Sequence, residues 1–171
     1  MKKTLCCLAG LGLVLGLIVH IISLLGIYIG DKTLFILILH IGIFIVWIPA
    51  ILELKKNSEF QQPEFMTNIN PKKLFGAIFK DTPKPVLYIS IGFFIYATIN
   101  FILFIQASGG GVPDFLDGKY VLNNRGSIIR ELTESEYYRM KANELRGLSG
   151  HWMSFYGFAM GILWPKKINE K

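Results

Sequence analysis

The segment Arg146–Lys167, RGLSGHWMSFYGFAMGILWPKK, decides whether this chain has three or four membrane-spanning helices. Outside a membrane, its run WMSFYGFAMGILW would be a large apolar surface in water with nothing to cover it. The run ends in Trp164, followed by Lys166 and Lys167, and such aromatic and basic residues are typical of the end of a span. We therefore expect a fourth spanning helix here.

The composition of the whole chain supports this interpretation. The chain has 171 residues, of which 52% are hydrophobic, and this is too apolar for a water-soluble domain of its size. A spanning helix needs about 20 consecutive apolar residues. Four stretches fit: Leu5–Ile29, Leu34–Leu52, Val86–Ala107 and Leu148–Trp164. The sequence predicts an all-α integral membrane protein with four transmembrane helices.

Basic residues are divided unevenly between the segments that connect these helices. The amino terminus, residues 53–85 and the tail after Trp164 together carry the whole formal net charge of +6, whereas the segments on the other side are neutral. By the positive-inside rule, both termini are cytoplasmic and residues 108–147 are extracytoplasmic, in a plasma or inner membrane. The lysines are scattered among prolines and acidic residues, so nucleic-acid binding is not expected.

This topology divides the chain into three parts. Residues 1–107 form a three-helix membrane region, residues 108–147 an extracytoplasmic segment, and residues 148–171 the fourth helix with a cytoplasmic tail. The cytoplasmic loop 53–85 contains NPKKLFGAIFKDTPKP, in which Asn70 can cap a helix and Pro71 suits its first turn. Its apolar residues share one face, which predicts a short interfacial helix flanked by lysines.

The extracytoplasmic segment 108–147, which we call the cap, is expected to contain a β-hairpin and a helix. It begins with SGGGVP, which we expect to be irregular. Residues 120–122 and 128–129 then flank a turn-forming NNRG, which predicts the hairpin. Thr133 and Glu136 form a capping-box pattern, and the helix is expected to end near Gly147. Some forty residues bury little core alone, so we expect the cap to rest on the membrane helices or on a partner.

Three polar side chains, His20, His40 and Asn100, lie deep within the predicted spans. Such groups need partners in a bilayer, and we expect them to form hydrogen bonds between helices. Gly12, Gly16 and His20 recur at helical spacing, so His20 is expected to face a closely packed helix. Alternatively, His20 and His40 could ligate a metal or the iron of a haem such as haem b, although no haem-attachment motif accompanies them.

A second pattern of small residues lies on the fourth predicted helix, at Gly150, Ser154, Gly157 and Gly161. It predicts close helix packing, in which Asn100 also takes part. His151 lies one position from this pattern, and we expect it to bond the cap.

Trp152 and Tyr156 are expected to act as anchors at the outer end of the fourth helix. Ser154 is one turn from His151, but no third group is spaced to orient them, so hydrolytic catalysis is not expected.

These features favour a protein that works by contact with other proteins. No acidic or basic residue lies in the core of a predicted span, which argues against ion-coupled transport. We expect an accessory or assembly subunit, or an immunity-type protein, that is not an enzyme and that contacts a membrane protein partner or a second copy. A redox subunit that binds haem or a metal is the alternative. The expected interaction residues are Tyr137, Tyr138, His151 and Trp152.

Overall fold

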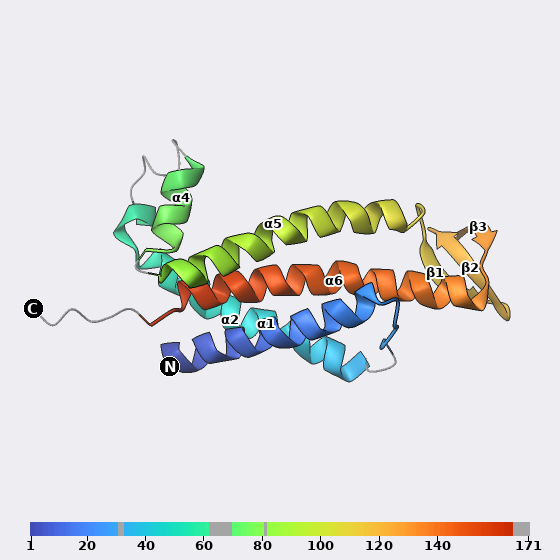
Figure 1. Ribbon diagram of the computed structural model, residues 1–171, viewed down its shortest axis with the longest axis horizontal. Helices are drawn as coiled ribbons and strands as arrows, with labels where there is room; N and C mark the ends of the chain where they lie inside the picture. Colours follow the sequence, from blue (N-terminus) through green and yellow to red (C-terminus); the bar gives the residue numbers. More distant parts are fainter. Residues whose placement is uncertain (31–32, 62–69, 81, 166–171) are drawn as a thin grey trace, which may run out of the picture.

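The computed structural model describes residues 1–30, 33–61, 70–80 and 82–165. Within these ranges, the chain forms a bundle of long helices with a small β-sheet at one end (Figure 1). The interior of the bundle and its junction with the sheet contain the polar residues that are described as candidate sites below. The packing of the long helices determines the geometry of both places.

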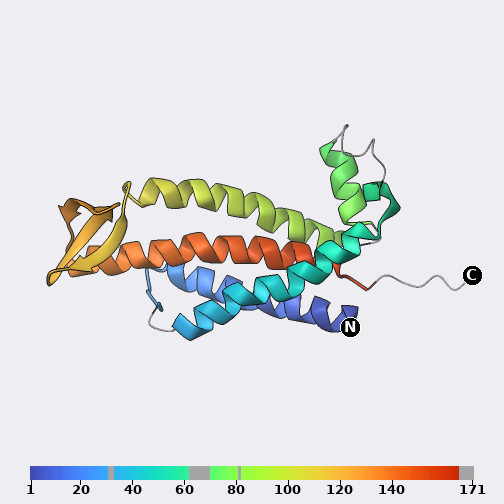
Figure 2. The same ribbon diagram turned by 180° about the vertical axis from the view of Figure 1, so that it is seen from behind.

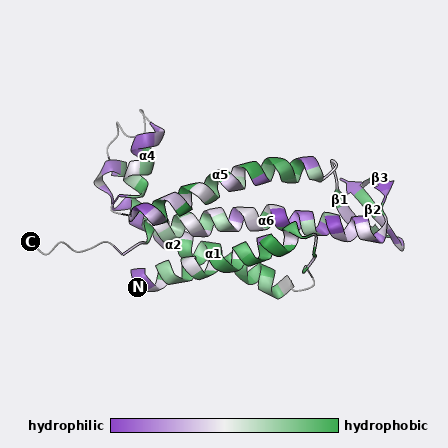
Figure 3. Cartoon of the chain, viewed as in Figure 1, coloured by the Kyte–Doolittle hydropathy of each residue, from purple (hydrophilic) through white to green (hydrophobic). Residues whose placement is uncertain are grey.

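Three helices are long and apolar enough to cross a membrane. They are α1 (Lys2–Leu24), α2 (Thr33–Lys55) and α5 (Lys84–Ala107). At about 1.5 Å per residue, each is about 35 Å long, enough for a hydrocarbon core of about 30 Å. Figure 3 shows these helices as mostly hydrophobic, whereas the sheet is largely hydrophilic. The first three predicted spans are thus found as long apolar helices, although the first ends at Leu24 and not at Ile29.

The longest helix, α6 (Glu134–Ile162), contains 29 residues and corrects the predicted organisation. The sequence predicts a helix that ends near Gly147 and a separate fourth span, but one uninterrupted helix covers both. It begins with the predicted capping box, in which Thr133 and Glu136 each bond the other's backbone N–H. Gly147 does not end the helix because it serves packing: a Cβ atom there would lie 2.9 Å from the ring of Phe104 on α5.

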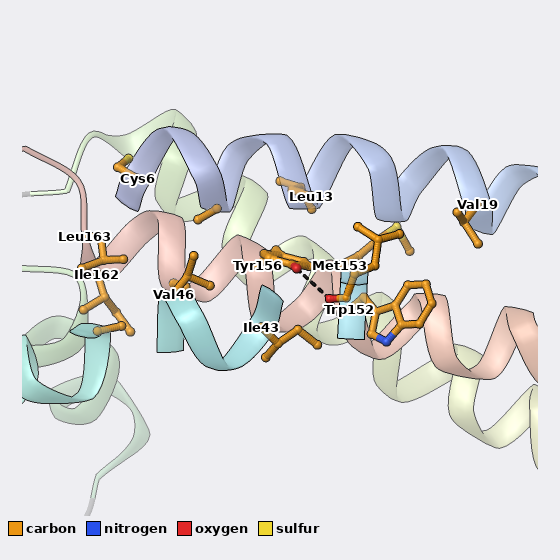
Figure 4. Close-up of a cluster of buried hydrophobic side chains, with 14 of the residues drawn as sticks. Cys6, Leu13, Val19, Ile43, Val46, Trp152, Met153, Tyr156, Ile162 and Leu163 are labelled. Carbon is orange, nitrogen blue, oxygen red and sulfur yellow. Dashed lines mark hydrogen bonds between the residues drawn. The ribbon is translucent and has the colours of Figure 1, made fainter. Parts of the chain in front are cut away.

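Helix α6 lies between α5 on one side and α1 and α2 on the other, and it packs against all three (Figure 1). Figure 4 shows the buried cluster where α1, α2 and α6 meet. Trp152 and Met153 of α6 are 1% and 0% exposed. The Tyr156 hydroxyl donates to the carbonyl of Leu39 on α2 at 2.7 Å.

Trp152 and Tyr156 therefore lie in the core and not at an outer rim, where the sequence analysis placed them. They can be buried because their polar atoms find acceptors inside the bundle. The indole N–H of Trp152 donates to Nδ1 of His40 at 3.2 Å, as the Tyr156 hydroxyl does to a backbone carbonyl.

The sheet has three antiparallel strands, β1 (Val112–Leu116), β2 (Lys119–Asn124) and β3 (Ser127–Glu131), in the order β1-β2-β3. The pair β2 and β3 is the predicted hairpin. Strand β1 begins inside the segment that was expected to be irregular, so that prediction is wrong from Val112 onward. Asp117 and Gly118 join β1 to β2 with positive φ angles of 49° and 79°, the conformation that a two-residue hairpin turn requires.

The end of the bundle opposite the sheet carries the amino terminus and a short helical segment (Figures 1 and 2). This segment consists of a 3-10 turn, η1 (Ser58–Gln61), and helix α4 (Pro71–Ile78). The predicted cap of α4 is confirmed, because the Asn70 side chain accepts from the backbone N–H of Lys72 at 2.9 Å. Lys166 and Lys167, which the sequence analysis used as a stop signal, lie outside the described residues.

Candidate functional site

A buried network of hydrogen bonds centres on His20 of α1, which is 2% exposed. Its Nδ1 atom lies 2.9 Å from the hydroxyl of Ser149 on α6, and its Nε2 atom lies 2.5 Å from the hydroxyl of Tyr96 on α5. The His20 and Tyr96 rings meet edge to face, with centroids 5.3 Å apart. One imidazole thus joins three helices.

Small residues on α1 bring His20 close enough to make these bonds. Gly12, Gly16, His20 and Ser23 are all buried and lie on one face of α1. Gly12 lies against the ring of Tyr156, and Gly16 lies beside Met153 and Trp152. The face predicted from the sequence is therefore the face that α1 turns toward α6.

The donors and acceptors of this network can be assigned, and the assignment leaves Ser149 without activation as a nucleophile. The Ser149 hydroxyl donates to the carbonyl of Leu145 at 2.7 Å, so it accepts the bond from Nδ1 of His20. Nε2 of His20 then accepts from the Tyr96 hydroxyl. A serine that acts as a nucleophile must give its proton to the base, and here that proton is held by a backbone carbonyl. The arrangement links helices and does not resemble a Ser–His pair prepared for acyl transfer.

The small-residue pattern on α6 faces α5. The Asn100 side chain of α5 is 2% exposed and donates to the carbonyl of Arg146 at 3.1 Å, beside Gly150. Further along, the Ser90 hydroxyl of α5 donates to the carbonyl of Gly157 at 2.7 Å. Gly161 lies against the ring of Phe79 and beside the Ser90 hydroxyl, and Ser154 is half-buried.

His40 and His151 have surroundings of their own. His40 is exposed and accepts from Trp152, whereas both ring nitrogens of His20 are bonded to Tyr96 and Ser149. These contacts do not bring the two histidines into one ligand set. Within the described residues, no group of three or more His, Cys, Asp or Glu side chains is placed to hold a metal ion.

The sequence analysis expected His151 to bond the cap, and its hydrogen-bond partner is Gly147, the last residue of the cap segment 108–147. Its Nδ1 atom lies 2.8 Å from the carbonyl of Gly147 in its own helix, and its ring meets Phe101 of α5 edge to face. His151 is placed in this way because α6 continues through Gly147, so the carbonyl one turn earlier is within reach of the imidazole.

A pocket of about 520 Å³ lies where the long helices meet the cap. Its walls come from the ends of α1 and α5, from the sheet and from the first turns of α6. Its polar wall contains Arg130, Arg139, Arg146, Glu136 and Asn143. We call it the arginine pocket. It is adjacent to the His20 network, because Ser23 follows His20 by one turn and Arg146 precedes Ser149 by one turn.

The outer surface of the cap carries a cluster of aromatic side chains. Tyr120 and Tyr137 stack with ring centroids 4.7 Å apart, and Tyr138 meets Tyr137 edge to face at 5.3 Å. Phe115 of β1 adjoins Tyr120, and Tyr28 adjoins Tyr138. Phe115 and Tyr138 are 53% and 41% exposed, so the cluster forms part of the surface.

Sequence reasoning missed Tyr96, Ser149 and the arginines of the pocket. Tyr96 and Ser149 complete the His20 network, and Arg146 lines the arginine pocket. One signal was available: Tyr96 and Asn100 are four residues apart on α5, so two polar-tipped side chains share one face of an apolar helix. Nothing in the spacing of the sequence pairs Ser149 with His20, because that pairing depends on how α1 and α6 are aligned.

Comparison with known proteins finds no matching family model, no similar curated protein and no similar solved structure. Function must therefore be argued from the residues and their contacts alone.

Proposed function

We propose that this chain is a multi-pass membrane protein with four spanning helices that acts through protein contacts at its cap. In this role it would be an accessory or assembly subunit, or an immunity-type protein, with both termini in the cytoplasm. The partner would be a second membrane protein, or a second copy of this chain, that reaches the extracytoplasmic surface.

The position of α6 supports a fourth span. Residues 148–162 of α6 lie among three apolar helices, so most of this segment faces protein and not lipid. A helix sheltered in this way can contain glycine, serine, histidine and tyrosine and still cross a membrane. This explains why its composition is less apolar than that of α1, α2 and α5.

The single observation that carries the contact function is the continuity of α6 from the bundle into the cap. Because one helix contributes to both, the sheet and its aromatic cluster are held in a fixed position relative to the membrane helices. Tyr137 and Tyr138 belong to this cluster, and tyrosine is enriched at protein interfaces because it combines a large apolar ring with a polar tip. A fixed aromatic surface of this kind suits recognition.

The hydrogen bonds around His20 favour a function in protein contacts and not an enzymatic function. His20, the buried histidine of the bundle core, already has both nitrogens bonded, and the Ser149 proton is directed to a backbone carbonyl. These groups stabilise the contacts between α1, α5 and α6, and none of them is left to activate a substrate.

Site-specific photocrosslinking in living cells tests the proposal. A benzophenone amino acid at Phe115 or Tyr138 should give a discrete protein adduct of defined mass after irradiation. The matched control is Ile102 on α5, which is 53% exposed on a helix proposed to face lipid. Ile102 should give no protein adduct, because lipid surrounds it.

The outcome also distinguishes recognition from simple membrane anchoring. Tyrosines that only sit among lipid headgroups would give the same result as Ile102, with lipid adducts alone. That result at both cap positions would overturn the contact function and leave the four-span topology unaffected.

A further inference from the structure

The arginine pocket lies at the level where two apolar helices end. Leu24 is the last residue of α1 and Gly26 follows it, while Ala107 is the last residue of α5 and Gly109 follows it. The opposite wall comes from cap residues of the sheet and α6. With α1 and α5 spanning a membrane as proposed, this position corresponds to the layer of lipid headgroups.

The charge of the pocket is positive. Three arginines line it, and one carboxylate, that of Glu136, faces them. Glu136 is already engaged: it accepts from Arg130 at 2.9 Å and from the backbone N–H of Thr133 at 2.8 Å. Among the described residues, neither Arg139 nor Arg146 forms an ion pair. Within the described ranges, two guanidinium groups of the pocket thus lack an ion-pair partner.

Arg146 is the more informative of the two because part of its guanidinium group is buried. Its Nε and Nη2 atoms are enclosed and have no hydrogen-bond partner within the described part of the chain. A buried cationic donor without an acceptor is strongly unfavourable, so an anion bound beside Arg146 would stabilise this site. The planar fork of arginine fits a phosphate group with two parallel bonds.

The apolar part of the pocket narrows the class of ligand. Leu24, Ala107, Leu122, Ile129 and Met140 line it beside the arginines. We propose that the arginine pocket binds a phosphate group between Arg139 and Arg146, and that the apolar wall accommodates hydrocarbon attached to this phosphate. An anionic phospholipid carries both parts, and free phosphate carries the first. The proposal rests on the membrane placement above but not on any protein partner.

Native mass spectrometry of the purified full-length chain in detergent tests the proposal. Phosphatidylglycerol and phosphatidylcholine are titrated against the wild type and three variants: Arg146→Gln, Arg139→Gln and Arg125→Gln. Arg125 is the matched control, because it is an arginine of the cap that lies in the β2–β3 turn, outside the arginine pocket. A parallel measurement follows the melting temperature in inorganic phosphate without added lipid.

We expect the wild type to bind phosphatidylglycerol at least about tenfold more tightly than phosphatidylcholine, since one charge-assisted bond corresponds to about that factor. Arg146→Gln should abolish this preference, Arg139→Gln should reduce it, and Arg125→Gln should retain it. If the lipids bind equally but inorganic phosphate raises the melting temperature of the wild type and not of Arg146→Gln, the phosphate site stands and its ligand is soluble.

The proposal is overturned if neither lipid preference nor phosphate stabilisation differs between the wild type and Arg146→Gln. Misfolding of that variant is not expected, because glutamine removes a buried unpaired charge. If Arg146→Gln still fails to fold, Arg146→Lys keeps the charge but lacks the fork, and it should bind phosphatidylglycerol more weakly than the wild type. Failure of the photocrosslinking test above would leave these results unchanged, so the two proposals fail separately.

Discussion

The Nε2 atom of His20 lies 2.5 Å from the hydroxyl oxygen of Tyr96, so a bond from α1 reaches α5 across the side of α6. Together with the bond from His20 to Ser149, it makes the imidazole a common partner of three helices. Helices in a bilayer gain little from hydrophobic association with one another, so such polar bonds and close packing determine how they are arranged.

The first prediction concerns this bond. Tyr96→Phe keeps the ring but leaves Nε2 of His20 buried without a donor. We expect a loss of about 1 kcal/mol in the free energy of unfolding, measured by thermal denaturation in detergent. The control is Thr98→Val on the same helix, because Thr98 is exposed and its hydroxyl bonds the carbonyl of Phe94 in its own helix. Equal melting temperatures for the two variants would show that the His20 bond contributes nothing.

The second prediction concerns close packing between α5 and α6. In Gly147→Ala, the new methyl group would lie 2.9 Å from Cγ of Phe104, so the Phe104 ring or the helices must shift, at a cost of about 1–3 kcal/mol. Gly92→Ala is the control within α5, because within the described chain no atom outside the adjoining helical backbone lies within 4 Å of its added Cβ. That variant should be neutral or slightly more stable. Similar behaviour of the two alanine variants in thermal denaturation would argue against a tight α5–α6 contact.

The third prediction concerns the dependence of cap stability on pH. The backbone N–H of Thr133 and the guanidinium of Arg130 hold the pKa of Glu136 below its ordinary value of 4.5. A group whose pKa is lowered on folding adds stability above its unfolded pKa, and this contribution is lost as pH falls through the folded value. Glu136→Gln should therefore lower the melting temperature at neutral pH, and the difference from the wild type should shrink below pH 4.5.

The control for this pH series is Glu134→Gln, which removes a charge from the same helical turn without breaking the capping box. Its difference from the wild type should not follow the same pH profile. A constant difference for Glu136→Gln down to pH 3 would show that its carboxylate makes no ionic contribution.

The fourth prediction concerns topology. In a background of Cys6→Ser and Cys7→Ser, an Asn124→Cys variant should react with an impermeant thiol reagent in intact cells. Lys72→Cys, in α4 at the other end of the bundle, should react only after lysis. The reverse pattern would invert the orientation, and labelling of both in intact cells would show that α5, the long helix between these two positions, does not cross the membrane.

Much of the helical architecture could be predicted from the sequence because apolar length and capping patterns are local. The three apolar helices, the cap of α4 and the capping box at Thr133 all depend on residues close together in the chain. Strand β1 could have been predicted as well, since Asp117-Gly118 is a strong hairpin signal between two short apolar runs.

The remainder depended on contacts between distant residues. Gly147 looks like the end of a helix until Phe104 is seen beside it, and Trp152 looks like a membrane anchor until His40 is seen to accept its N–H bond. The arginine pocket also depends on contacts between distant residues. Arg130, Arg139 and Arg146 lie on two elements, and the packing of the cap on the bundle brings them to one cavity.

Helix α6 also has a mechanical consequence. It is a stiff rod of about 44 Å that starts beside the sheet and ends at the opposite end of the bundle. There, the carbonyl of Met160 faces the thiol of Cys6 at 3.6 Å, and the carbonyl of Gly161 accepts from the hydroxyl of Thr82 at 3.0 Å. A force that tilts or turns the rod at the sheet is therefore transmitted to the start of α1 and to the segment that leads into α5.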